Sequence, residues 1–272
     1  MTQGLERIAT AAVGIPIVLG LLWLGGWYFF GFIVVIALVA QFEMIKLLQH
    51  AKWPISTVWT MLMGVVILLR PFVSHWEAIG TATLLLFAFS RLRTGPDRIA
   101  ERVSGALLAS FYPVWLLSFL VDIQWEAYEN LGQPGAFWLI LMLLALIWAT
   151  DSGAYYTGKT WGKHKFAPSI SPNKTWEGTV GGVLFALLVA VIFKHSVLTD
   201  LTWVDAGVLA LLGGVWGQLG DLLESAFKRN AGVKDSGSLL PGHGGMLDRF
   251  DSLIFTAPAY YLYLHHATGI LG

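Results

Sequence analysis

Long uncharged runs of apolar residues recur along the whole chain, and they constrain its fold more than any other feature. Residues 139–150, for example, carry no charge, so a helix formed by them would be apolar on every side. A soluble domain carries about 25% charged residues, whereas this chain of 272 residues has 12% charged and 56% hydrophobic residues. We therefore predict an all-α, polytopic membrane bundle.

Nine segments are long enough to cross a bilayer, which takes roughly 20 apolar residues. They run near 8–25, 27–48, 57–73, 76–90, 102–121, 136–157, 176–194, 205–226 and 250–269. The third and fourth are short, and a re-entrant hairpin is the alternative for this pair. We interpret the first as a retained span rather than a signal peptide, because no small-residue cleavage site follows it. The seventh and eighth are rich in glycine, which lets neighbouring backbones approach closely.

Lysine and arginine residues are unevenly distributed between these segments. Cytoplasmic segments of membrane proteins are enriched in both residues. If the spans alternate from a cytoplasmic N-terminus, all of the 17 basic residues except Arg70 and Lys194 face the cytoplasm. The expected outer loop, 122–133, contains acids and no basic residue. We therefore expect the active site to face the cytoplasm. The compact chain, with no targeting extension, predicts an integral protein of a bacterial inner (plasma) membrane.

The chain divides into two regions by the distribution of its polar motifs. Residues 1–122 are predicted to form N-terminal transmembrane helices that act as a scaffold, with lipid access or oligomer contacts. Residues 123–272 are predicted to form the C-terminal catalytic region, with a nucleotide and metal site at its cytoplasmic face.

Several functional classes are disfavoured by composition and context. The chain has no cysteine, which excludes thiolate zinc sites, disulfides and cysteine nucleophiles. No basic stripe with interleaved aromatics occurs, so nucleic acid is not an expected partner. Residues 153–160 match the phosphate-loop expression, but that loop works between a buried strand and a helix, and here it follows an apolar segment.

A polar stripe interrupts the eighth apolar segment. Asp221, Glu224, Ser225 and Lys228 are spaced so that one helix face carries all four. Asp151 lies at the inner end of the sixth segment. Charged groups inside a membrane are costly, so the stripe predicts a polar partner such as a metal ion with a bound phosphate. The alternative is that these acids mark helix ends in contact with water.

The segment that follows the stripe combines bases, acids and glycines as a magnesium–polyphosphate site does. Glycines let loop amides close on phosphate oxygens, and Lys and Arg neutralise phosphates. Carboxylates suit Mg²⁺, which completes its shell with water and substrate phosphate. A solvated basic loop is the alternative, but it does not explain why Asp248 and Asp251 stand three residues apart at the start of the ninth segment.

The segment between the sixth and seventh apolar runs has a similar character. Pro172 precedes a predicted helix start, and Lys174 lies beside the free amides expected there, a combination that predicts an anion site. The alternative is a helix entry beside a basic loop.

Residues 225–251, SAFKRNAGVKDSGSLLPGHGGMLDRFD, resemble the signature of the phosphatidate cytidylyltransferases, also called CDP-diacylglycerol synthases. The motifs DSGAY at 151–155, SPNKTWEG at 171–178 and GDLLES at 220–225 resemble the same family. The likeness is specific from about residue 148 to residue 255. Before that region only hydropathy agrees.

The resemblance implies a reaction in phospholipid biosynthesis, in which CTP and phosphatidic acid give CDP-diacylglycerol and pyrophosphate. It implies Mg²⁺, with K⁺ as a candidate second ion, held at Asp221 and Asp248, and we expect Asp251 to be a further ligand. The expected partners are CTP, phosphatidic acid and the lipid bilayer. A second copy of the chain, in a homodimer, is a further candidate partner.

Each motif residue has an expected role. The catalytic residues are predicted to be Asp221, Asp248, Lys228 and Arg229, and the substrate-binding residues Lys234, Lys174, Arg249, His243, Gly244, Gly245 and Ser225. Within these sets the basic side chains bind phosphates, although Arg249 could instead orient the carboxylates. The glycines let amides approach the nucleotide, and Ser225 and Glu224 support the metal ligands.

Two other functions fit parts of the pattern. A CDP-alcohol phosphotransferase or polyprenyl-phosphate transferase also joins nucleotide and lipid chemistry, but the phosphotransferase motif D-G-x2-A-R-x8-G-x3-D-x3-D is absent. An ion-coupled transporter would carry charges near mid-membrane on repeat-related helices. Here the charges gather toward one predicted face, and no internal repeat is detected.

Overall fold

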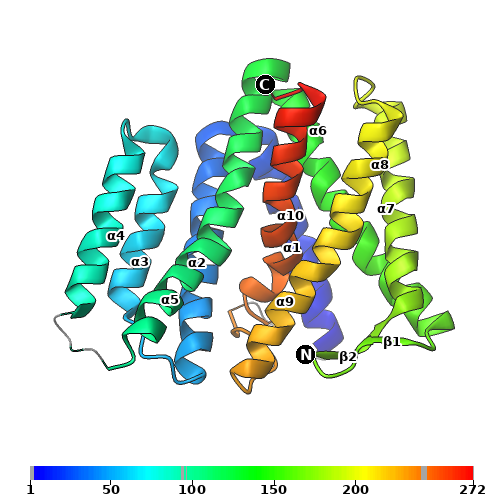
Figure 1. The fold of residues 1–272 in the computed structure, drawn as a ribbon. Coiled ribbons are helices and arrows are strands. Elements are labelled where there is room, and N and C mark those ends of the chain that lie inside the picture. The colour runs from blue at the N-terminus through cyan, green and yellow to red at the C-terminus, as the bar shows by residue number, and fades with distance from the viewer. Residues whose placement is uncertain (1–2, 93–94, 96, 240–243, 272) are drawn as a thin grey trace.

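The computed structural model describes residues 3–92, 95, 97–239 and 244–271, and these form a helical bundle with one small hairpin (Figure 1). The helices are α1 (Gln3–Leu24), α2 (Gly26–His50), α3 (Thr57–Leu68), η1 (Arg70–Phe72), α4 (Trp76–Leu92), α5 (Ile99–Ser110), η2 (Phe111–Trp115), α6 (Leu116–Trp161), α7 (Trp176–Ser196), α8 (Trp203–Leu211), η3 (Leu212–Trp216), α9 (Gly217–Asn230), α10 (Leu247–Tyr263) and η4 (Leu264–Thr268). The strands are β1 (Lys165–Ala167) and β2 (Ser171–Thr175).

Four helical stretches of the described chain are long and apolar enough to cross a membrane: Gly26–His50, Ile99–Trp161, Trp176–Ser196 and Trp203–Asn230. Shorter apolar helices cover Ala12–Leu24, Thr57–Leu68 and Trp76–Ser90. This composition agrees with the predicted all-α membrane architecture. The number of nine spans and the cytoplasmic N-terminus stay predictions.

The fifth and sixth predicted spans correspond to two helical segments that meet at a kink. α5, the π-helical turn η2 and α6 follow one another, and the helix is interrupted at Gly132, where φ is 73° and ψ is 178°. Glycine adopts a positive φ without the steric cost that other residues meet. The break lies inside the predicted 122–133 loop, but the predicted extent of that loop is wrong, because residues 122–131 are helical.

The basic segments of the chain gather at one end of the bundle. The start of α1, the turn after α2, the start of α5, the hairpin and the end of α9 lie together at this end, at the bottom of Figure 1. η1, which contains Arg70, and the α7–α8 turn lie at the opposite end. This separation agrees with the predicted alternation of basic and acidic segments.

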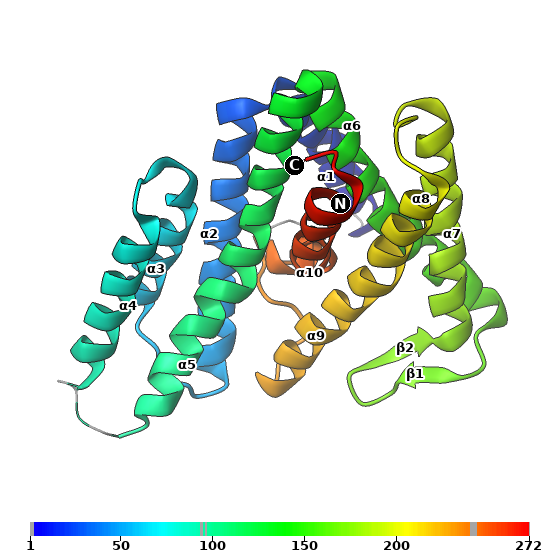
Figure 2. The same ribbon diagram turned by 45° about the horizontal axis from the view of Figure 1, so that its top comes forward.

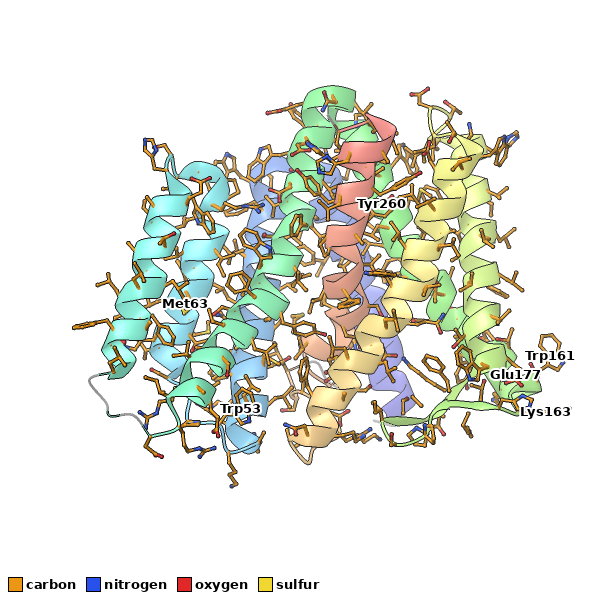
Figure 3. The ribbon with its side chains drawn as sticks, in the orientation of Figure 1. Trp53, Met63, Trp161, Lys163, Glu177 and Tyr260 are labelled. Carbon is orange, nitrogen blue, oxygen red and sulfur yellow. The ribbon has the colours of Figure 1, made fainter. Side chains whose placement is uncertain are left out.

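The core lies around α6 and α10, while α3 and α4 stand at one side of the bundle (Figure 2). Tyr260 of α10 is fully buried, and its hydroxyl donates to the backbone oxygen of Leu139 in α6 at 3.0 Å. Figure 3 places Tyr260 well away from the hairpin end, which Trp161, Lys163 and Glu177 mark. This buried contact between α6 and α10 therefore lies in a different part of the bundle from the hairpin.

Glycines allow α6 and α7 to cross closely next to the hairpin. A Cβ atom added at Gly178 would lie 2.9 Å from the backbone oxygen of Ala154 and 3.3 Å from the Cα of Gly158. The prediction that the glycine-rich seventh segment permits close backbone contact is confirmed.

The β1–β2 hairpin links these two helices and was not predicted from the sequence. Lys165 pairs with Thr175 in antiparallel register, with an irregularity between Lys165 and Ala167. Thr175 also caps α7, because its side-chain oxygen accepts the N–H of Gly178 at 3.1 Å. The hairpin therefore holds the residue before Thr175, Lys174, at the entrance to α7.

Candidate active site

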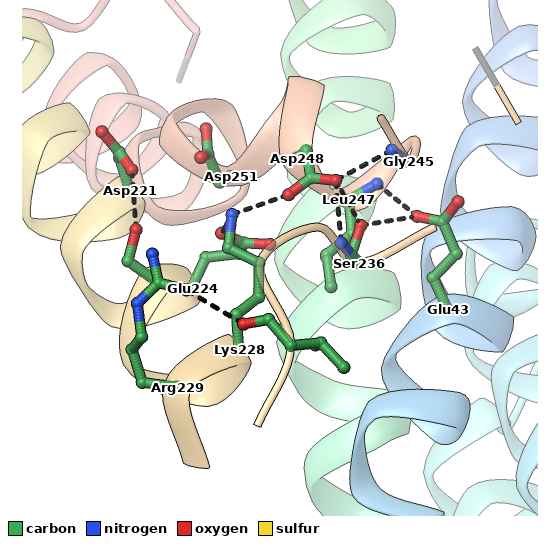
Figure 4. A network of polar contacts seen from close by, with 12 residues as sticks. Glu43, Asp221, Glu224, Lys228, Arg229, Ser236, Gly245, Leu247, Asp248 and Asp251 are labelled. Carbon is green, nitrogen blue, oxygen red and sulfur yellow. Dashed lines mark hydrogen bonds and ion pairs between the residues drawn. The ribbon is translucent and has the colours of Figure 1, made fainter. Parts of the chain in front are cut away.

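The polar face predicted for α9 forms as its spacing implies, and Lys228 links it to α10 (Figure 4). The ammonium nitrogen of Lys228 lies 2.5 Å from Oε2 of Glu224 and 2.6 Å from Oδ1 of Asp248. The side chains of Glu224 and Asp248 are 0% and 3% exposed. Lys228 therefore forms ion pairs with two buried carboxylates on two different helices.

Asp248 is held by the segment that precedes α10. Its Oδ2 accepts the N–H and the hydroxyl of Ser236, each at 2.9 Å, and the N–H of Gly245 at 2.8 Å. Gly244 has a φ of +82°, and a Cβ atom there would come 2.8 Å from Oδ2. Both the backbone conformation and the lack of space therefore require glycine at this position.

A second ion pair joins α9 to the hairpin. The ammonium nitrogen of Lys174 lies 2.8 Å from Oδ2 of Asp221 and donates to the backbone oxygen of Gln218 at 3.3 Å. Ser225 donates to Oδ1 of Asp221 at 3.3 Å. The two polar segments that the sequence singled out separately thus meet at Asp221.

α9 and α10 pack closely beside Asp221. A Cβ atom added at Gly220 would lie 2.7 Å from the backbone oxygen of Asp251. The side chain of Asp251 accepts the N–H of Ser252 at 2.5 Å. Asp221 is therefore the residue that follows this contact on α9, and the backbone of Asp251 forms the α10 side of the contact.

Two cavities adjoin these acids. The smaller, of about 310 Å³, is lined by polar groups that include Asp151, Lys174 and Asp221. The larger, of about 580 Å³, has Asp151, Asp248, Arg249 and Asp251 among its lining residues. Its other walls are largely apolar, formed by residues of α1 and α6: Gly14, Ile15, Val18, Leu144, Ile147 and Trp148. Asp151 borders both cavities.

The donor chemistry of this region fits a divalent cation. Asp151, Asp221 and Asp251 bring carboxylate oxygens from α6, α9 and α10 to the cavity walls. Oδ1 of Asp248 has Lys228 as its hydrogen-bond donor, so it retains an acceptor position. Hard oxygen ligands of this kind suit Mg²⁺. Among the residues that the structure describes, no three His, Asp or Glu side chains are already arranged to hold a metal ion.

Other predicted residues take different positions. Arg229 is exposed and donates to the backbone oxygens of Ile170 at 3.2 Å and Val233 at 3.0 Å, so it ties the hairpin turn to the end of α9. Lys234 is exposed, and Arg249 lines the larger cavity. His243 lies outside the described residues. The roles predicted for these side chains stay predictions.

Sequence reasoning assigned no role to three residues that the structure brings into this region. Asp151 was noted but not included among the site residues, although it borders both cavities. Ser236 donates to Asp248, and Glu43 of α2 accepts the N–H of Leu247 at 2.7 Å. A signal for Glu43 was present, because an acid inside an apolar segment indicates a function by default.

Comparisons with known proteins cover nearly the whole chain. A model described as "Cytidylyltransferase family" matches residues 5–267. The chain is 37% identical over 267 residues to a phosphatidate cytidylyltransferase of Bacillus subtilis, which covers 95% of this chain and 97% of the relative. It is 34% identical over 283 residues to one from Synechocystis, covering 95% and 96%. A third, from Staphylococcus haemolyticus, is 34% identical over 254 residues, covering 93% and 95%.

Proposed function

We infer that this chain, which belongs to the cytidylyltransferase family, catalyses the reaction of CTP with phosphatidic acid to give CDP-diacylglycerol and pyrophosphate. Relatives named phosphatidate cytidylyltransferase match it over about their full length. The structural observation that carries the proposal is the pair of cavities that share Asp151.

The smaller cavity is proposed to take the phosphates of CTP. Lys174, Asn173 and the capping residue Thr175 line it, and they offer a cation and polar groups at the start of α7. Free amides at a helix N-terminus and a nearby lysine favour anions.

The larger cavity is proposed to take phosphatidic acid. A lipid with a phosphate headgroup needs a charged end and an apolar wall, and this cavity offers Arg249 together with Ile15, Val18 and Trp148. Because Asp151 borders both cavities, the two substrates can meet beside it.

The chemistry requires charge cancellation more than proton transfer. A phosphate oxygen of the lipid attacks the α-phosphorus of CTP, a new P–O bond forms, and the bond to pyrophosphate breaks. The nucleophile is already an anion, so no strong general base is needed. Positioning and electrostatic stabilisation supply most of the catalysis in phosphoryl-transfer reactions. Lys174 would provide positive charge from the smaller cavity and Arg249 from the larger one.

Magnesium binding is part of the proposal, with K⁺ as a candidate second ion. Asp221, Asp251 and Oδ1 of Asp248 would hold the metal, with Asp151 as an additional oxygen donor. Bound Mg²⁺ supplies positive charge that neutralises phosphate oxygens. Lys228 would keep Asp248 ionised and oriented, because it contacts the same carboxylate.

The reaction is tested with radiolabelled CTP and detergent-solubilised phosphatidate, using the purified full-length protein with Mg²⁺ or with EDTA. We expect labelled liponucleotide only in the presence of the metal. A CDP-alcohol phosphotransferase would instead consume CDP-lipid, and a transporter would yield no labelled lipid at all. Failure to form liponucleotide under both conditions would exclude the proposed activity.

We also propose that the hairpin end faces the cytoplasm of a bacterial inner membrane. The chain has no native cysteine, so single cysteines can be labelled without background. In right-side-out membrane vesicles, an impermeant maleimide should label Arg70→Cys before permeabilisation and Lys234→Cys only afterwards. The reverse pattern would place the site on the outer side. A homodimer is a further candidate, which the mass of the detergent-solubilised protein would test.

A further inference from the structure

Glu43 is a buried acid of α2 that contacts the first turn of α10 (Figure 4). It is 6% exposed. Its Oε1 accepts the N–H of Met246 at 3.0 Å, and its Oε2 accepts the N–H of Leu247 at 2.7 Å. The first amides of a helix have no partner within the helix. Glu43 therefore accepts hydrogen bonds from two amides at the start of α10, although it lies more than 200 positions earlier in the chain.

The segment before α10 also packs around Glu43. A Cβ atom at Gly237 would lie 2.5 Å from Oε1 of Glu43, and one at Gly245 would lie 2.5 Å from Oε2. The hydroxyl of Ser236 lies 3.1 Å from Oε2 of Glu43 and 2.9 Å from Oδ2 of Asp248. Glycines at these positions therefore make room for a carboxylate that comes from the other half of the protein.

The backbone N–H groups at and before the start of α10 donate to either Asp248 or Glu43. Asp248 accepts the amides of Ser236 and Gly245, and Glu43 accepts the next two amides, those of Met246 and Leu247. Hydrogen bonds to an ionised acceptor are stronger and shorter than neutral ones. The position of Asp248 consequently depends on Glu43 through the backbone that both carboxylates hold.

We propose that Glu43 is a positioning residue for the reaction. It fixes the first turn of α10, and through it the carboxylate of Asp248 and the ammonium of Lys228. Glu43 is not among the residues lining the two cavities at the site, so it acts through α10 rather than by touching substrate. The inference rests on the proposed role of Asp248 in the active site.

The test compares Glu43→Gln with Gln41→Ala in the full-length protein. Glu43→Gln keeps the size of the side chain but replaces one acceptor oxygen by an NH₂ group, which cannot accept an amide proton. Gln41 is a matched control, because it is a fully buried residue of the same helix that donates to Thr60 and Ser110 rather than to the α10 segment.

Five quantities are measured for each variant: kcat, KM for each of the two substrates, the Mg²⁺ concentration that gives half-maximal activity, and the melting temperature. Loss of a residue that holds a metal ligand in place lowers metal affinity or activity about 10–100-fold. We expect Glu43→Gln to lower kcat by about that factor and to raise the Mg²⁺ midpoint several-fold, while KM for phosphatidate stays within about twofold. Gln41→Ala should lower the melting temperature without moving the Mg²⁺ midpoint.

An unchanged kcat and Mg²⁺ midpoint in Glu43→Gln would overturn the inference, as would a loss no larger than that of Gln41→Ala. If Glu43→Gln does not fold, Ser236→Ala replaces it, since this change removes the hydroxyl between the two carboxylates. A normal Mg²⁺ midpoint in Ser236→Ala would then count against the inference. Asp248→Asn is assayed in parallel: activity in that variant refutes the proposed site, whereas inactivity there with a normal Glu43→Gln refutes the role of Glu43 alone.

Discussion

Lys228→Met should lower the stability of the protein strongly, because it removes the cation shared by two buried acids. Lys228 lies 2.5 Å from Glu224 and 2.6 Å from Asp248. Neither oxygen of Glu224 accepts a hydrogen bond of good geometry, so the ion pair with Lys228 is what compensates its charge in the described structure. Asp248 keeps its contacts with Ser236 and Gly245. Most of the cost should therefore come from Glu224.

Removing one partner of a buried ion pair costs about 3–5 kcal/mol, because the other charge stays buried without compensation. For a chain of this size, 1 kcal/mol corresponds to about 2–4 °C in Tm, so the expected fall is on the order of 10 °C. The fluorescence of the 13 tryptophans, followed during heating in detergent, reports the transition.

Two further variants complete this experiment. Lys234→Met removes an exposed lysine that follows α9 and should leave Tm nearly unchanged. The double variant Glu224→Gln with Lys228→Met should recover part of the loss, because it no longer buries an uncompensated carboxylate. The reasoning is refuted if Lys228→Met loses no more stability than Lys234→Met, or if the double variant is less stable than the single one.

Two other predictions concern the same helices. Asp221→Asn and Asp248→Asn should each give a monodisperse, folded protein whose turnover is lower by about 100-fold or more, the order expected when a preorganised charge is lost; near-normal turnover in both would remove the metal assignment. Gly220→Ala should lower stability by about 1–3 kcal/mol, because the added Cβ would lie 2.7 Å from the backbone oxygen of Asp251. Gly207→Ala is its control, since nothing lies within 4 Å of a Cβ atom there, and equal melting temperatures would contradict the close α9–α10 contact.

Local patterns of the sequence predicted the local parts of the structure. The spacing of Asp221, Glu224 and Lys228 sufficed to place them on one helix face, because helical geometry alone decides this. The apolar runs predicted the helices in the same way. The predicted loop at 122–133 contains the break at Gly132 but is too long, since an acidic stretch is compatible with either a loop or a helix end. The β1–β2 hairpin was missed because its short strands have no alternating apolar pattern.

Contacts between distant segments could not be predicted from spacing. The sequence indicated anion sites at Lys174 and in the segment after α9, but only the folded chain pairs Lys174 with Asp221. The glycines before α10 were interpreted as making room for nucleotide, whereas in this structure the amide of Gly245 donates to Asp248. A glycine pattern reports that something comes close to the backbone, and it does not distinguish a ligand from a side chain such as Glu43.

Because Lys174 and Asp221 form an ion pair, the affinity of the smaller cavity for a cation depends on whether an anion is bound there, and the affinity for an anion depends on whether a cation is bound. An ammonium group has three N–H donors, and in this structure Lys174 directs two of them to Asp221 and to the backbone of Gln218. A cation bound by Asp221 weakens the hold of that carboxylate on Lys174 and leaves the lysine freer to contact an anion. Thermodynamic linkage makes this effect reciprocal, so an anion on Lys174 strengthens cation binding at Asp221 by the same factor. An ion and its counterion therefore enter this cavity more readily together than either enters alone.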